Sequence, residues 1–106
     1  MNTQKPLTNA ETAAFFSQMA MLYKAGIAPA ECVNILMEDA PTESGRALLQ
    51  KIYDVVSEGS SLHEAVAAAG VFPKYAVKTL ELGEESGNLD ICLDSLGDYY
   101  EKQDSI

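Results

Sequence analysis

The stretch "VSEGSSLHEAVAAAG", residues 56–70, contains the signals that end one helix and begin the next. Gly59 suits the left-handed conformation that often follows the last turn of a helix. Ser61 and Glu64 have the spacing of a capping box, in which each side chain accepts a hydrogen bond from the other residue's backbone N–H. The stretch therefore predicts a helix, a tight turn and a short second helix that finishes at Gly70.

A similar order of residues recurs at two other glycines. Gly26 and Gly59 are each followed five residues later by a glutamate and then by apolar residues, and Gly87 is followed by a more compact version of the pattern. An acidic residue in the first turn of a helix interacts favourably with the helix dipole. This weak repeat predicts three helical hairpins with structural turns at Gly26, Gly59 and Gly87.

Apolar residues with helical spacing predict six helices, at about residues 9–25, 29–40, 43–58, 61–69, 74–85 and 89–102. No segment shows the alternation of period two that is typical of strands. The predicted fold class is all-α, a compact bundle of six antiparallel helices built from three helical hairpins. We expect residues 1–8 to form an N-terminal extension and residues 9–103 to form a single domain.

The charge balance excludes two classes of partner. The chain has 106 residues and a formal net charge of −9, and its seven basic residues are scattered. Nucleic acids bind clustered Lys and Arg, and an anionic membrane surface repels an acidic protein. No apolar run is long enough to span a bilayer, so we expect membrane contact only through segments outside this chain. The first residues lack the pattern of a signal peptide, which predicts exposure to the cytoplasm.

No catalytic constellation is recognisable in the sequence. His63 is the only histidine and has no nearby cysteine, which favours an exposed structural role. Cys32 and Cys92 fall in apolar helical patterns and are interpreted as reduced core residues. In the pairs Phe15–Phe16 and Tyr99–Tyr100, we expect one ring to pack inward and the other to lie near the surface. The prediction is that this protein is not an enzyme.

The C-terminal part of the chain concentrates acidic residues, with eight of the sixteen lying between residues 81 and 104. Four of them follow helical spacing and form the acidic stripe, which consists of Asp90, Asp94, Asp98 and Glu101. The plain interpretation is a solvated helix face. The alternative is a docking surface for a basic partner, because like charges at this spacing destabilise a helix unless they are compensated.

The segment "GEESGNLD", Gly83–Asp90, is interpreted mainly as a corner between two helices. Gly87 would end the fifth helix and Asn88 would be the N-cap of the sixth. Gly83 would allow close packing by a neighbouring helix. Two further hypotheses concern the acids of this corner: Glu84 and Glu85 are exposed and available to a partner, or Glu84, Glu85 and Asp90 hold a Ca²⁺ or Mg²⁺ ion. The segment does not match an EF-hand loop.

Three longer stretches resemble a known family: "FFSQMAMLYKAGIAPAECVNIL" (15–36), "VVSEGSSLHEAVAAAGVFPKY" (55–75) and "ELGEESGNLDICLDSLGDYYE" (81–101). They are similar, in order and spacing, to the cytoplasmic domain of the type II secretion system F proteins. The same family includes the inner-membrane platform proteins of type IV pilus assembly. The combination of "EGSSLHEA", "FP" and "GEESGNLD" is specific, although each motif by itself is weak.

The resemblance implies a bundle of six antiparallel helices without catalytic activity. It also implies a location on the cytoplasmic face of the inner membrane, within an integral membrane protein. Such a platform would connect an assembly ATPase to pilin-like subunits, with that ATPase and other platform proteins as partners and a homodimer as a further option. One alternative interaction module is a helix-hairpin adaptor of the tetratricopeptide kind, although the residue pattern of that repeat is missing.

Overall fold

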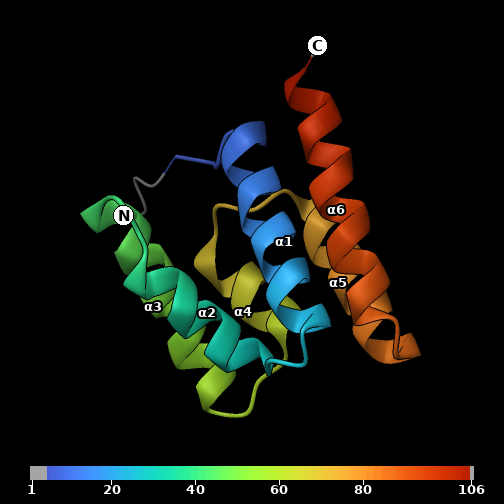
Figure 1. Cartoon of the computed structure of the whole chain (residues 1–106), viewed down its shortest axis with the longest axis horizontal. Helices are drawn as coiled ribbons and strands as arrows, with labels where there is room; N and C mark the ends of the chain where they lie inside the picture. The colour runs from blue at the N-terminus through green and yellow to red at the C-terminus, as the bar shows by residue number, and fades with distance from the viewer. Residues whose placement is uncertain (1–4, 106) are drawn as a thin grey trace.

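The computed structural model describes residues 5–105, and these residues form six helices and no strand (Figure 1). The helices are α1 (Asn9–Lys24), α2 (Pro29–Glu38), α3 (Glu43–Ser57), α4 (Leu62–Ala69), α5 (Lys74–Ser86) and α6 (Leu89–Asp104). All six predicted helices are present, and the predicted all-α fold class is confirmed. Residues 1–4 of the expected N-terminal extension lie outside the described residues.

Two helices begin with the predicted capping boxes. At the start of α1, Thr8 Oγ1 accepts a hydrogen bond from the Glu11 N–H at 3.0 Å, and Glu11 Oε1 accepts one from the Thr8 N–H at 2.9 Å. Ser61 and Glu64 make the same reciprocal pair at the start of α4. The hydrogen bonds from the backbone N–H and the hydroxyl of Ser61 lower the pKa of Glu64, because they stabilise its carboxylate.

The three predicted turn glycines all have positive φ angles, of 95° at Gly26, 104° at Gly59 and 74° at Gly87. After α1, the Gly26 N–H donates to the Tyr23 carbonyl and the Ile27 N–H to the Leu22 carbonyl. This pair of hydrogen bonds satisfies carbonyls that the end of a helix leaves free. The predicted turns at these glycines are therefore confirmed.

Asn88 is the N-cap residue of α6, but its side chain does not cap the helix. Its amide nitrogen instead donates to Ser86 Oγ at 3.1 Å. The Asn88 backbone N–H donates to the Gly83 carbonyl at 2.8 Å, which ties the residue to the end of α5. The predicted N-cap position at Asn88 is therefore confirmed, although no side-chain hydrogen bond caps α6.

The first and last helices close the bundle. Each helix contacts the next along the chain, and α1 packs most extensively on α6. The radius of gyration is 12.7 Å, the size expected for a compact chain of ~100 residues. In a tetratricopeptide-type stack each repeat contacts only its neighbours. The adaptor alternative is therefore wrong for this chain.

Helix α1 is the central helix and lies between α2 and α6 (Figure 1). Its buried residues include both Phe15 and Phe16, which contact each other and also Phe72. The expectation that one of these two rings would lie near the surface was wrong, because Phe72 packs against both rings. The same expectation for Tyr99 and Tyr100 is confirmed, since Tyr100 is buried and Tyr99 is exposed.

Two glycines bring helices unusually close together. A Cβ atom added at Gly83 would lie 2.9 Å from Cys92 Cβ, so α5 and α6 meet without room for a side chain. This confirms the expected close packing at Gly83. At Gly97 of α6, an added Cβ would lie 3.2 Å from the Ser17 nitrogen of α1 and closer still to the Ser17 hydroxyl.

Leu7, shortly before α1, is also attached to the bundle. The Leu7 N–H donates to the Val71 carbonyl at 2.9 Å, and the Leu7 side chain packs against the core. Across the described residues, no helix has both the length and the apolar character that crossing a bilayer requires.

Candidate functional site

The acidic stripe lies on the exposed side of α6. All four of its carboxylates are exposed, and the buried residues of the helix lie on the other side. The residues that face the core are Leu89, Leu93, Leu96, Gly97 and Tyr100. The predicted spacing therefore places the acids on one solvent-facing surface.

One stripe residue already has a basic partner within the chain. Lys24, in the last turn of α1, places its Nζ atom 2.6 Å from Asp94 Oδ2, and both side chains are about half exposed. The hydrogen bond and charge of Asp94, with smaller contributions from Asp90 and Asp98, raise the pKa of Lys24. The stripe is thus partly compensated inside the molecule, which reduces the need for a basic partner there.

The sequence interpretation missed the pairing of Lys24 with the stripe. A basic residue in the last turn of a helix is usually explained by the helix dipole. The pairing across α1 and α6 depends instead on these two helices lying side by side, which no local pattern indicates.

Glu84 is not an exposed acid, and that prediction was wrong. Its side chain is 21% exposed and reaches from α5 to the start of α4. There Oε2 accepts a hydrogen bond from the Leu62 N–H at 2.8 Å, and Oε1 accepts one from the His63 N–H at 3.0 Å. The first N–H groups of a helix have no partners within that helix, so Glu84 caps α4 from a neighbouring element.

His63 is joined to the same carboxylate. Its Nδ1 atom lies 2.7 Å from Glu84 Oε1 and 2.9 Å from Ser61 Oγ. In a Ser-His-acid relay the hydroxyl and the carboxylate contact opposite nitrogens of the ring. Here both contact the same nitrogen, so the cluster connects α4 to α5 and does not have the arrangement of a relay. The ring is 23% exposed, which makes His63 less exposed than predicted.

The three candidate ligands for a cation have different environments. Glu85 and Asp90 are exposed, whereas both oxygens of Glu84 accept hydrogen bonds from the start of α4. Within residues 5–105, no three His, Cys, Asp or Glu side chains come together in a group that could hold a metal ion. Binding of Ca²⁺ or Mg²⁺ at this corner stays a prediction.

The two cysteines are free thiols at interfaces between helices. Cys32 is buried and Cys92 is partly buried against Gly83. Burial raises the pKa of both thiols, because a thiolate loses solvation there. The raised pKa values favour a structural role for both cysteines, as neutral thiols that fill space between helices.

The chain is a small all-α domain in which acidic residues outnumber basic ones. The family model described as "Type II secretion system (T2SS), protein F" matches residues 15–106, and the chain therefore belongs to this family. The match covers the acidic stripe, the corner at residues 83–90 and all three turn glycines.

Individual relatives agree with this family. The chain is 30% identical over 99 residues to the type 4 fimbrial assembly protein PilC of Pseudomonas putida, covering 93% of this chain and 25% of that protein. It is 30% identical over 104 residues to the type II secretion system protein F of Xanthomonas campestris pv. campestris, covering 97% of this chain and 26% of that protein. The chain thus spans about a quarter of the length of these curated relatives.

Proposed function

We propose that this chain is a non-catalytic interaction domain of an inner-membrane platform protein. In this role it would connect an assembly ATPase at the cytoplasmic face to pilin-like subunits, in type II secretion or type IV pilus assembly. The observation that carries the proposal is the family match over residues 15–106, which includes nearly the whole bundle. Membrane attachment would come from segments outside this chain.

The chemistry of the surface supports binding more than catalysis. The only histidine is held by Glu84 at the start of α4, and that carboxylate is occupied by backbone N–H groups. The exposed acids of α6 are Asp90, Asp98, Glu101 and Asp104, together with Asp94 paired to Lys24. A surface of this kind favours a partner with Lys or Arg side chains and makes association dependent on salt.

A pull-down of this chain against the assembly ATPase and other platform proteins of its own system tests the proposal. We expect retention of the ATPase, weakened by raised salt and by the double substitution Asp98→Asn with Glu101→Gln. Asp94 is left intact, because replacing it would also change the Lys24 contact. The matched control is Glu31→Gln with Glu58→Gln, which removes the same charge from exposed sites elsewhere.

Failure of every component to bind would overturn the proposed function. Retention that is equal in the stripe double variant and in wild type would keep the platform role but remove the stripe from it. Analytical ultracentrifugation of the chain checks the homodimer hypothesis in the same samples.

A cation remains a separate proposal for the corner at residues 83–90. Glu85 and Asp90 are its exposed carboxylates, and they would need further oxygen ligands from water or a partner to satisfy Ca²⁺. Calorimetric titration with calcium and a melting curve in its presence check this. Absence of both heat and a shift in melting temperature would remove the cation from the proposal.

A further inference from the structure

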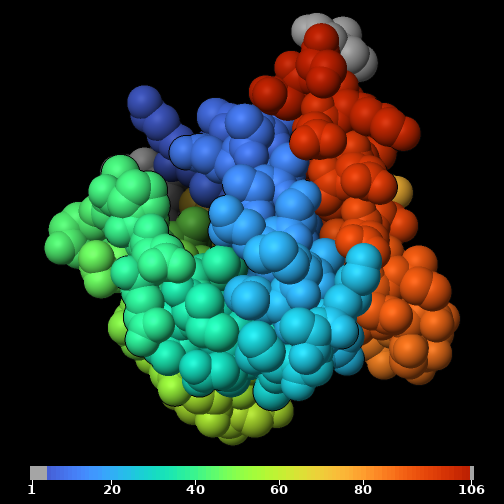
Figure 2. Space-filling model, in the orientation of Figure 1, coloured from blue at the N-terminus to red at the C-terminus, as the bar shows by residue number. Residues whose placement is uncertain are grey.

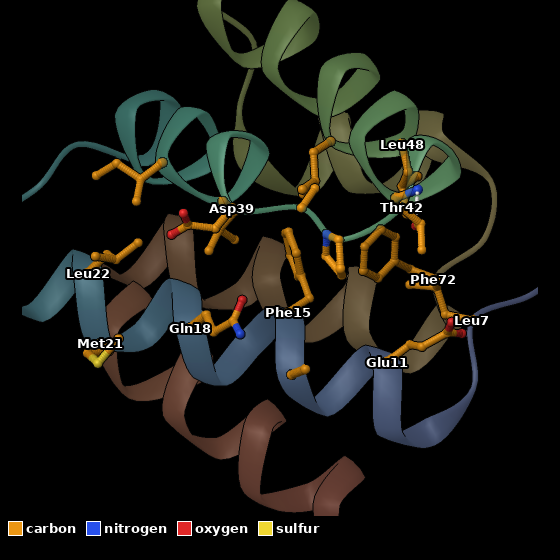
Figure 3. A pocket seen from close by; sticks show the side chains of 17 residues that line it. Leu7, Glu11, Phe15, Gln18, Met21, Leu22, Asp39, Thr42, Leu48 and Phe72 are labelled. Carbon is orange, nitrogen blue, oxygen red and sulfur yellow. Dashed lines mark hydrogen bonds between the residues drawn. The ribbon is translucent and has the colours of Figure 1, made fainter.

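An apolar groove runs between α1 and the α2–α3 pair on the side of the bundle away from α6 (Figure 3). Its volume is about 570 Å³, and the recess is visible between α1 and α3 on the molecular surface (Figure 2). Phe15 and Phe72 lie at its base with their ring centroids 5.0 Å apart. The base is thus a rigid aromatic surface anchored in the core.

The α1 wall of the groove has the form of a helical docking face. Its lining residues are Glu11, Ala14, Phe15, Gln18, Met21 and Leu22, which follow the spacing of one side of a helix. At 1.5 Å per residue this wall is ~16 Å long, or about three helical turns. Ala14 is exposed near its middle, and its small side chain would let a partner backbone approach closely.

The opposite wall presents apolar surface that the fold leaves incompletely covered. Leu36, Leu48 and Leu49 line it and are only partly buried, although they also pack against the core. Met21, across the groove, is 65% exposed. Partly buried leucines and methionine around a preformed groove are typical of surfaces that take the apolar face of another helix.

Carboxylates mark the two ends of the groove. Glu11 lies near Leu7 at one end, and Asp39 lies toward Leu22 at the other (Figure 3). One Glu11 oxygen accepts a hydrogen bond from the Thr8 N–H. Asp39 is the exposed C-cap residue of α2. No Lys or Arg is among the residues that line the groove. A ligand with positive charge at both ends would complement this arrangement.

We propose that this groove binds an amphipathic helix of a partner protein, about three turns long. The helix would place aliphatic anchors at i, i+4 and i+7 in the groove and a Lys or Arg at each end, beside Glu11 and Asp39. The inference rests on the proposed function only for the identity of the protein that supplies the helix. A second copy of this chain is a poorer occupant, because two molecules of net charge −9 repel each other.

Selection of displayed peptides of about 16 residues, in a random library, on the wild-type chain tests the groove without a known partner. We expect enriched sequences with aliphatic residues at helical spacing and basic residues at both ends. Their affinity, measured by fluorescence anisotropy, should fall about tenfold or more in Ala14→Trp, because the indole fills the groove. The matched control is Ala10→Trp, an exposed alanine on α1 that does not line the groove.

The charges are tested separately from the shape. Glu11→Gln with Asp39→Asn should weaken the same peptides about fivefold at low salt and little at high salt. Glutamine can still complete the capping box, so α1 should keep its start. Glu31→Gln with Glu58→Gln removes equal charge away from the groove and should leave the affinity unchanged. Melting curves confirm that each variant is folded.

Three results would overturn the inference. Enriched peptides that bind Ala14→Trp as well as wild type would place their site on another surface, and failure to enrich any sequence would show that the groove takes no helix. Dissociation of a dimer of the chain by Ala14→Trp, in sedimentation, would make a second copy the occupant. In the pull-down, loss of all partners in wild type counts against the proposed function, whereas equal binding by wild type and Ala14→Trp counts against the groove.

Discussion

The two sides of α1 meet the rest of the bundle in opposite ways. On the α6 side, Gly97 lies against the Ser17 backbone with no room for a Cβ atom. On the α2–α3 side, a groove of about 570 Å³ follows the helix for about three turns. Both sides belong to one helix with apolar residues on two faces. The difference in packing therefore comes from the neighbouring helices, which are α6 on one side and α2 and α3 on the other.

The α6 side of α1 is a closely packed contact that holds the bundle together, whereas the groove side is an open surface available for binding. Close helix packing gains many dispersion contacts and tolerates little change in volume. An open groove leaves apolar surface in water, which a partner can remove on binding. We therefore expect substitutions on the α6 side to change stability, and substitutions on the groove side to change binding.

The largest effect is expected from Gly97→Val, which places a branched side chain against Ser17. It should lower the free energy of unfolding by about 2–3 kcal/mol, measured by urea denaturation, because the added atoms meet backbone. The control is Ser95→Val at an exposed position on the same helix. Equal losses in the two variants would show that the α6 side of α1 has room for a side chain, and so is not closely packed.

A double-mutant cycle sharpens the same point. Gly97→Ala should cost less than valine, and Ser17→Ala in that background should recover part of the loss, because the Ser17 hydroxyl is the nearest atom to the added Cβ. Additive effects of the two substitutions would show that they do not share a contact.

The next largest effect on stability is expected at Glu84, which connects α5 to the start of α4. Glu84→Ala should lower the free energy of unfolding by about 1–2 kcal/mol, because the Leu62 and His63 N–H groups lose their acceptor. Thermal and urea unfolding measure this. Glu85→Ala, at the exposed neighbouring position, is the control and should change little. A similar loss in both variants would mean that the charge, and not the cap, is responsible.

A smaller effect is expected where Lys24 of α1 meets Asp94 of α6. The contact raises the pKa of Lys24 above its ordinary value of 10.5. Its contribution to stability is therefore complete below that pH and is lost as the pH rises through the raised value. The melting temperature of wild type should exceed that of Asp94→Asn at neutral pH, and the difference should disappear at pH values above the raised pKa. A difference that is constant across this range would contradict the assignment.

The smallest effect on stability is expected from Ala14→Leu, on the groove side. Added atoms there enter open space, so the free energy of unfolding should stay within about 0.5 kcal/mol of wild type. Urea denaturation beside Gly97→Val gives the direct comparison. A loss comparable to that of Gly97→Val would show that the groove is closed in solution.

Much of the fold is predictable from local signals. The capping boxes at Thr8 and Ser61 join residues three positions apart, and the turn at Gly59 satisfies carbonyls of the helix just before it. Such interactions depend on neighbouring residues, so the sequence predicts them without knowledge of the rest of the chain. Gly83 gave a weaker signal, since a glycine within a helix suggested a close neighbour without identifying Cys92.

The candidate site was predicted in part. The spacing of Asp90, Asp94, Asp98 and Glu101 placed these acids on one exposed face of α6, as the structure confirms. The same reasoning treated Glu84 and Glu85 alike, although one caps α4 and the other is exposed. Two adjacent acids on a helix point in different directions, and only the position of α4 decides which of them is used.

The six helices, the three glycine turns and the acidic face can be predicted from the sequence, because hydrogen bonds and side-chain spacing within a few residues specify them. Three other features are visible only in the folded chain: α1 packs against α6, Lys24 meets Asp94 across 70 residues, and a groove remains beside Phe15. These features depend on which surfaces meet when the helices pack. Close packing at Gly97 closes the bundle on one side of α1, and the space left on the other side is the groove.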